Sequence, residues 1–127
     1  MEKAEREQWE RREREEGFVR VRFRLLTTEE GGRHAPIGDG YRACWDIGNR
    51  TESGERMFND APMLYESRDE WIAPGGDGVA RIHPLVPELW VNVQPGPDVE
   101  MYEGSRVVGR GEVLEVVAGV AEDASGH

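Results

Sequence analysis

Hydrophobic and polar residues alternate strictly within residues 18–26, FVRVRFRLL, where Val19, Val21, Phe23 and Leu25 alternate with Arg20, Arg22 and Arg24. A period of two is typical of a β-strand that buries one face and exposes the other. The pattern therefore predicts a strand whose apolar side chains enter a core. Its three arginines either face a partner or pair with acids on a neighbouring strand, and we favour the second interpretation.

Shorter apolar runs follow, separated by segments rich in Gly and Pro. We predict strands at YRACWDIG (41–48), MLYES (63–67), EWIAP (70–74), VARIHPL (79–85), LWVNV (89–93), VEMYEG (99–104) and SRVVGRGEVLEVV (105–117). The polar residues 49–60 are expected to form a loop. Many short strands with Gly and Pro turns favour an all-β sandwich or a closed barrel. Within the last run, Gly109 and Gly111 indicate a bulge or a close approach of two backbones.

The two ends of the chain differ from this strand-rich middle. Residues 1–16 are almost all charged, and acids repeatedly precede arginines by four residues, which favours a helix. A helix this short is marginal in water unless it packs on another element, and Trp9 is the residue suited to anchor it. We therefore favour a frayed charged arm over a partner-binding helix. Residues 119–127 are small and polar and predict a disordered tail. The expected organisation is an arm over 1–16, a β domain over 17–118 and that tail.

Composition and charge narrow the class of partner. The 127 residues make one domain, long enough to bury a hydrophobic core. The net charge is -10, and the acidic excess persists within residues 17–118. Broad binding to DNA needs a positive surface, so DNA is not an expected partner, although a local basic patch remains open. A single cysteine and the lack of long apolar runs lead us to expect a cytoplasmic protein without a membrane partner.

A search for chemistry along the chain finds no motif that predicts catalysis. Lys3 is the only lysine and lies far from any glycine-rich loop, so a phosphate-binding loop is not predicted. One cysteine and three scattered histidines give no metal-ligand spacing. Glu29 and Glu30 are adjacent and would point apart in extended chain, and Cys44 is interpreted as a buried structural thiol. We therefore predict no catalytic residue, no metal and no cofactor, and not an enzyme.

The segment TTEEGGRHAPIGDGYRACW (27–45) is either a ligand-binding loop or a long connection between two strands. Together with the later EGSRVVGRGEVLEVV it resembles the C-terminal β-barrel, domain III, of bacterial elongation factor Tu. The matching residues are Glu30, Gly31, Gly32, Arg33, His34, Pro36, Gly40, Tyr41 and Arg42, then Glu103, Gly104, Arg106, Val108, Gly109 and Gly111. The resemblance covers roughly residues 18–118. It implies an all-β fold, a single six-stranded antiparallel (Greek-key) β-barrel, here preceded by the short charged N-terminal helix.

The chain departs from that family at several points. Ala43, Cys44 and Trp45 stand where the family has Pro-Gln and an aromatic residue, and residues 46–71 are longer and more acidic. The GTP-binding domain and the second barrel of the factor have no counterpart in this sequence. GTP hydrolysis and delivery of aminoacyl-tRNA are therefore not expected of it.

The resemblance also implies a contact surface. Domain III of the full factor packs on the GTPase domain and contacts the T-arm side of tRNA. Carried over by position, the candidate contact residues are Arg33, His34, Tyr41, Arg42, Arg106 and Gly109. Arginine forks suit phosphates and glycine permits close approach, which fits such a surface. In the competing interpretation, the glycines serve turn geometry while the tyrosine and arginines pack and pair internally.

Two functional hypotheses follow from the sequence. The leading one is a non-catalytic recognition module that binds a translation-related macromolecule, first a protein partner and second tRNA or another structured RNA. The alternative is an immunity-type or regulatory protein that binds and neutralises a toxin or a translation factor, because a small acidic protein suits a partner with a basic face. An enzyme is the least favoured class.

Overall fold

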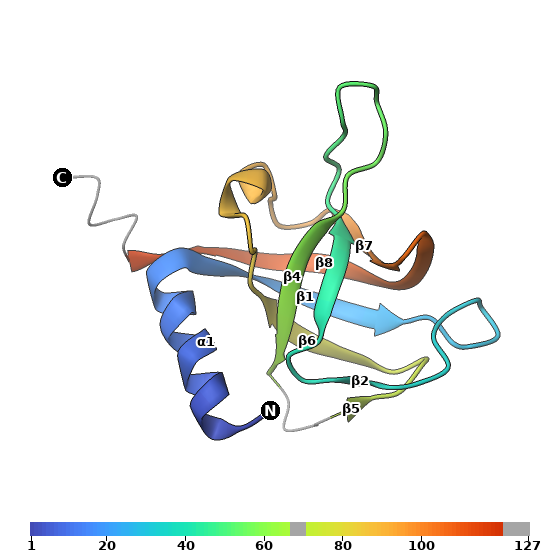
Figure 1. Ribbon diagram of the computed structural model, residues 1–127, viewed down its shortest axis with the longest axis horizontal. Helices are drawn as coiled ribbons and strands as arrows, with labels where there is room; N and C mark the ends of the chain where they lie inside the picture. The colour runs from blue at the N-terminus through green and yellow to red at the C-terminus, as the bar shows by residue number, and fades with distance from the viewer. Residues whose placement is uncertain (67–70, 121–127) are drawn as a thin grey trace.

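The computed structural model describes residues 1–66 and 71–120. Six strands close into an antiparallel β-barrel in the order β1-β6-β4-β3-β7-β8, as Figure 1 shows. They are β1 (Gly17–Leu25), β3 (Arg42–Asp46), β4 (Asn59–Tyr65), β6 (Asp77–Ile82), β7 (Asp98–Glu103) and β8 (Arg106–Ala118). Helix α1 (Lys3–Glu16) precedes the barrel, the short strands β2 (Ile37–Gly38) and β5 (Trp71–Ile72) pair beside it, and the 3₁₀ helix η1 (Pro87–Trp90) lies between β6 and β7. The predicted six-stranded antiparallel barrel with a short N-terminal helix is confirmed.

Strand β1 shows why the alternating pattern was informative. Its valines, Phe23 and Leu25 are buried in the barrel core, and its arginines point outward. Arg20 forms two hydrogen bonds with Glu66, at 2.6 and 2.9 Å. Arg24 donates to Glu30 at 2.8 Å. Arg20 and Arg24 therefore pair with acids as favoured, but those acids follow β4 and β1 and do not lie on the two strands adjacent to β1. Arg22 lies opposite Glu112 of β8 and makes no ion pair among the described residues.

The glycines of β8 allow two backbones to approach, as predicted. A Cβ on Gly111 would lie 2.5 Å from Val21 Cγ1, which is closer than real Cβ atoms come. A Cβ on Gly109 would lie 3.1 Å from the carbonyl oxygen of Arg24. The register of β8 also shifts against both β1 and β7, which marks the predicted irregularity of this strand.

Helix α1 is docked on the barrel, so the interpretation of residues 1–16 as a frayed arm is wrong for the helical part, Lys3–Glu16. Glu13 is only 6% exposed, and its Oε2 lies 3.0 Å from Arg81 Nε and 3.2 Å from His83 Nε2. The Trp9 ring packs with its centroid 5.4 Å from that of His83, so Trp9 is the anchor that the sequence indicated. The sequence did not predict the burial of Glu13, because nothing in the charge pattern of the helix distinguishes this carboxylate from the exposed ones.

The predicted strand LWVNV is the second correction. Residues Pro87–Trp90 form η1, with Pro87 at its first turn, where its missing N–H costs no hydrogen bond. Trp90 is buried, whereas Leu89 and Val91 on either side of it are exposed. Leu89 and Val91 thus lie outside the core, whereas Trp90 belongs to it.

Several smaller differences concern element boundaries. The predicted loop over residues 49–60 ends earlier, because Asn59 and Asp60 already belong to β4. Of the predicted strand EWIAP, Glu70 lies outside the described residues, and Trp71–Ile72 form β5, which pairs with β2 outside the barrel. Of the tail predicted over 119–127, residues 121–127 lie outside the described residues. Among the residues described, no helix has both the length and the apolar composition that a membrane span requires.

Candidate functional site

The strand directions place the loops at two opposite ends of the barrel. At one end lie the connection after β1, residues 26–36, and the β7–β8 turn, residues 104–105 (Figure 1). At the other end lie the β3–β4 loop, η1, and the junction between α1 and β1. The predicted contact residues belong mostly to the first end, so we describe it first.

Three of the predicted residues gather around one carboxylate. Arg33 Nη1 donates to Glu103 Oε2, and the Tyr41 hydroxyl donates to the same oxygen at 3.0 Å. Arg106 Nη2 lies 3.8 Å from Glu103 Oε1. The Arg33 guanidinium also lies 5.2 Å from the centroid of the Tyr41 ring. We call these four residues the Glu103 cluster.

The charged and titratable groups of the Glu103 cluster interact mainly with one another. Burial raises the pKa of Tyr41, and the hydrogen bond and charge of Glu103 raise it further against the opposing charge of Arg33. Tyr41 is therefore a hydrogen-bond donor at neutral pH. Glu103 shares its charge between Arg33 and Arg106, so a phosphate at this place would compete with an existing carboxylate. Arg106, whose side chain is 50% exposed, is the most accessible cation of the cluster.

Arg42 lies apart from the Glu103 cluster and pairs with Asp60 on β4. Its Nη2 and Nε lie 2.9 and 3.1 Å from Asp60 Oδ2. The Cys44 thiol donates to Asp60 Oδ1 at 2.9 Å, and this bond, followed by the bonds and charge of Arg42, holds the pKa of Asp60 below its ordinary value against the effect of burial. Burial raises the pKa of Cys44 to about 11, and Asp60 contributes to the rise. Cys44 is therefore protonated at neutral pH, as expected of a structural thiol, although it is partly exposed and not buried as predicted.

The remaining two predicted residues occupy different surroundings. His34 is exposed in the connection after β1. Gly109 is buried in β8, opposite Leu25 and Met101, so its lack of a side chain serves the barrel wall. The predicted set is thus divided into the Glu103 cluster, the Arg42–Asp60 pair, an exposed histidine and a buried glycine.

The glycine-rich part of residues 27–45 serves turn geometry. Gly31 has φ +94°, and a Cβ on Gly32 would lie 2.4 Å from the carbonyl oxygen of Leu26. Glu30 accepts hydrogen bonds from Arg24 and from the backbone N–H of Thr27, which lower the pKa of Glu30 to about 2. The segment therefore serves as a connection between two strands, and this connection positions its basic residues.

The opposite end of the barrel carries a surface that the sequence did not predict. Trp90 is buried there, and exposed large apolar side chains surround it. We call this surface the Trp90 end; its exposed apolar members are Phe58, Val86, Leu89, Val91 and Val116.

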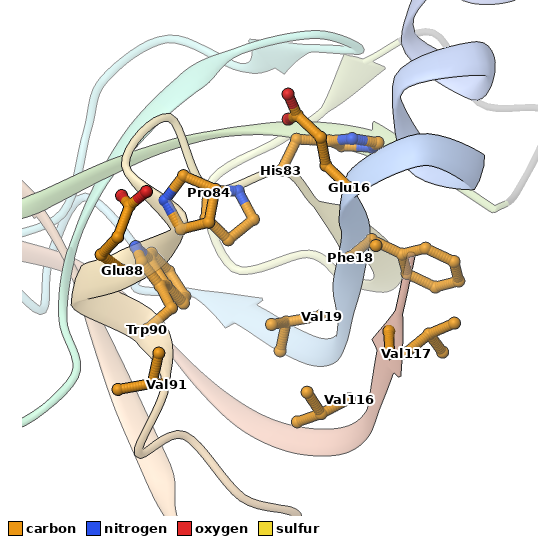
Figure 2. A pocket seen from close by; sticks show the side chains of 13 residues that line it. Glu16, Phe18, Val19, His83, Pro84, Glu88, Trp90, Val91, Val116 and Val117 are labelled. Carbon is orange, nitrogen blue, oxygen red and sulfur yellow. The ribbon is translucent and has the colours of Figure 1, made fainter. Parts of the chain in front are cut away.

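Trp90 lines two hollows at this end. The larger has a volume of about 490 Å³ and lies between η1, β1 and the end of β8, with Phe18, Val91 and Val116 among its lining residues (Figure 2). The smaller has a volume of about 230 Å³ and is lined by Phe58 and Leu89, among others. The Arg42–Asp60 pair also lines the smaller hollow, so this predicted residue belongs to the Trp90 end.

The sequence contained one signal for this surface. Proline at the first turn of a helix is a recognised start signal, and Val86-Pro87 followed by an acidic residue would have predicted η1 in place of a strand. A helical turn would in turn have left Leu89 and Val91 without a place in the sheet.

No family model matches the chain. Within residues 1–66 and 71–120, no group of three or more His, Cys, Asp or Glu side chains is arranged to hold a metal ion.

Proposed function

We propose that the protein is a non-catalytic recognition module whose partner is a protein linked to translation, as the resemblance to domain III of elongation factor Tu implies. The observation that supports a protein partner is the Trp90 end, where five large apolar side chains are exposed around two hollows. Clustered apolar residues exposed on a folded domain mark interaction surfaces.

The pairing of the arginines favours protein over RNA. Arg33 and Arg106 face Glu103, and Arg42 faces Asp60, so each is already engaged by a carboxylate. RNA phosphates would have to displace these acids on a chain whose net charge is -10. Structured RNA is therefore the second candidate partner.

The immunity-type or regulatory alternative uses the same surface. A net charge of -10 favours a partner with a basic face and would speed the encounter with it. The two versions differ in the identity of the partner, which is a toxin in one and a component of the translation machinery in the other.

The test is capture from a native lysate with the full chain and two variants. Leu89→Asp places a charge in the Trp90 end, and Trp71→Asp places one at an exposed residue away from it. We expect stoichiometric, nuclease-resistant capture of a protein by the wild type and Trp71→Asp, and its loss with Leu89→Asp. Thermal unfolding of each variant verifies that it is folded.

A parallel titration with bulk tRNA distinguishes the RNA candidate. Binding at low salt that falls steeply as salt rises, and that is lost when Arg33 and Arg106 become Ala, would overturn the protein proposal in favour of RNA. Equal capture by both variants and the wild type would place the interface elsewhere.

A further inference from the structure

The larger hollow of the Trp90 end has the dimensions of a binding pocket. Figure 2 shows Trp90 and Val91 on one side of it and Phe18, Val116 and Val117 on the other. Its volume of about 490 Å³ falls within the range of about 300–1,000 Å³ that is usual for ligand pockets. Its walls come from η1, β1 and β8, which are three elements of the same barrel end.

The charges at this hollow have one sign. The ionised residues that line it are Glu16 and Glu88, and no arginine or lysine is among the lining residues. Glu16 pairs with Arg12 within α1 at 2.7 Å, whereas Glu88 makes no ion pair within the described residues. An apolar cavity beside an unpaired carboxylate favours an occupant that joins an apolar body to a positive charge.

Two buried polar groups at the hollow lack partners. Trp90 is 5% exposed, and its Nε1 has no hydrogen-bond partner among the described residues. His83 is 2% exposed; its Nδ1 is likewise unpartnered, while its Nε2 faces Glu13. Buried indole N–H groups ordinarily find an acceptor, and a peptide carbonyl is one. Both nitrogens are closed to solvent in this structure, so an acceptor reaches them only if the wall of the hollow opens.

We propose that this hollow binds an apolar side chain of a partner-protein segment in which a neighbouring residue is arginine or lysine. This inference rests on the proposed function, since it names the chemistry of the protein partner. The apolar side chain enters between Trp90 and Val116, and the cation meets Glu88.

An extended segment fits this end better than a small molecule or a second copy of the chain. Trp90 also lines the smaller hollow, which can receive a second side chain of the same segment. Two copies of a chain with net charge -10 would repel each other, and neither would bring a cationic excess to Glu88.

The first test uses two capped dipeptides, N-acetyl-leucyl-arginine amide and N-acetyl-leucyl-glutamate amide, with the ¹⁵N-labelled full chain. The indole signal of Trp90 is assigned by its loss in Trp90→Phe. We expect the basic dipeptide to shift this signal with a dissociation constant of about 1–10 mM and the acidic one to bind at least about fivefold more weakly. Equal shifts with both dipeptides, or none with either at about 50 mM, would overturn the proposal.

Matched variants locate the binding. Val91 lines the hollow and is 75% exposed, whereas Val120 is 65% exposed and lines neither hollow. Arginine at either position should leave the fold intact, so we expect Val91→Arg to abolish binding of the basic dipeptide and Val120→Arg to preserve it. Glu88→Gln should weaken that binding by about two- to fivefold, and the control Glu112→Gln should not change it. Binding that survives Val91→Arg would overturn the site.

The outcomes separate this inference from the proposed function. Capture of a protein that Leu89→Asp abolishes, without dipeptide binding, would leave the function standing and overturn the chemistry proposed for the hollow. Dipeptide binding at Trp90 without protein capture would overturn the proposed function and support the chemistry proposed for the hollow. Self-association in sedimentation experiments that Val91→Arg abolishes would overturn the proposal in favour of a second copy.

Discussion

The two ends of the barrel use their side chains in opposite ways. At the Glu103 cluster, Arg33 and Arg106 are turned toward a carboxylate of the same domain. At the Trp90 end, Leu89 and Val91 are turned toward solvent although they are apolar. The charged residues that look like a contact surface in the sequence are satisfied within the domain, and the residues that look like core are exposed. This contrast favours the Trp90 end as the recognition surface.

The largest effect is expected from the carboxylate that ties α1 to the barrel near the Trp90 end. Glu13→Ala would leave Arg81 and His83 facing each other without their shared acid. Removing one member of a buried ion pair costs about 3–5 kcal/mol, and we expect a loss near the lower limit because the Arg81 side chain is 24% exposed. Urea unfolding measures it, and Glu10→Ala on the same helix is the control. A loss below about 1 kcal/mol would show that α1 contributes little to the stability of this end.

A second test concerns the glycines at the opposite end. In Gly32→Ala the new Cβ would lie 2.4 Å from a backbone oxygen of Leu26, which cannot move away as a side chain can. We expect a loss of about 2–3 kcal/mol in the free energy of unfolding. Gly31→Asn is the matched control, since its site is open and Asn tolerates positive φ better than most residues. Equal losses would mean that the steric contact does not decide the need for Gly32.

Strand β1 and Glu13 show what could and could not be predicted from the sequence. The alternation in β1 is a local pattern, so the strand and its buried face followed from the residues themselves. The burial of Glu13 depends on Arg81 in β6 and on His83 directly after it, about seventy residues further along the chain, and no local pattern reports such a contact. The predicted contact residues were likewise identified by type, while their partners Glu103 and Asp60 became visible only when the barrel closed.

The Trp90 end was missed for a different physical reason. LWVNV has the composition of a strand, and apolar residues were expected to be buried. Pro87 instead begins a helical turn, which buries Trp90 and leaves its neighbours outside the barrel. The helical backbone of η1, and not the strand-like composition of LWVNV, thus decides that Leu89 and Val91 are exposed.

The contrast between the ends can be weakened by neutralising the Glu103 cluster. Glu103→Gln keeps the size of the side chain but removes the charge that engages Arg33 and Arg106. We expect a loss of about 1 kcal/mol in stability and tighter binding of bulk tRNA at low salt, because two arginines lose their carboxylate. Glu100→Gln on the same strand is the control. Unchanged tRNA binding would show that this end does not become an RNA surface even when its acid is removed.

The smallest effect is expected for the Arg42–Asp60 pair, which lines the smaller hollow of the Trp90 end and contains the predicted contact residue Arg42. Arg42→Ala removes an ion pair whose arginine side chain is 64% exposed, so the stability should fall by less than about 0.5 kcal/mol. The pKa of Asp60 lies below its ordinary value through the bonds from Cys44 and Arg42, so the variant should raise it, as carboxyl NMR titration would show. A depressed carboxyl pKa stabilises the fold above the unfolded-state value, and this contribution is lost as the pH falls through the folded-state value. The small difference between wild type and variant should therefore be present at neutral pH and vanish in acid. A difference that persists below the pKa of Asp60 would mean that Arg42 acts through packing in the smaller hollow and not through its charge.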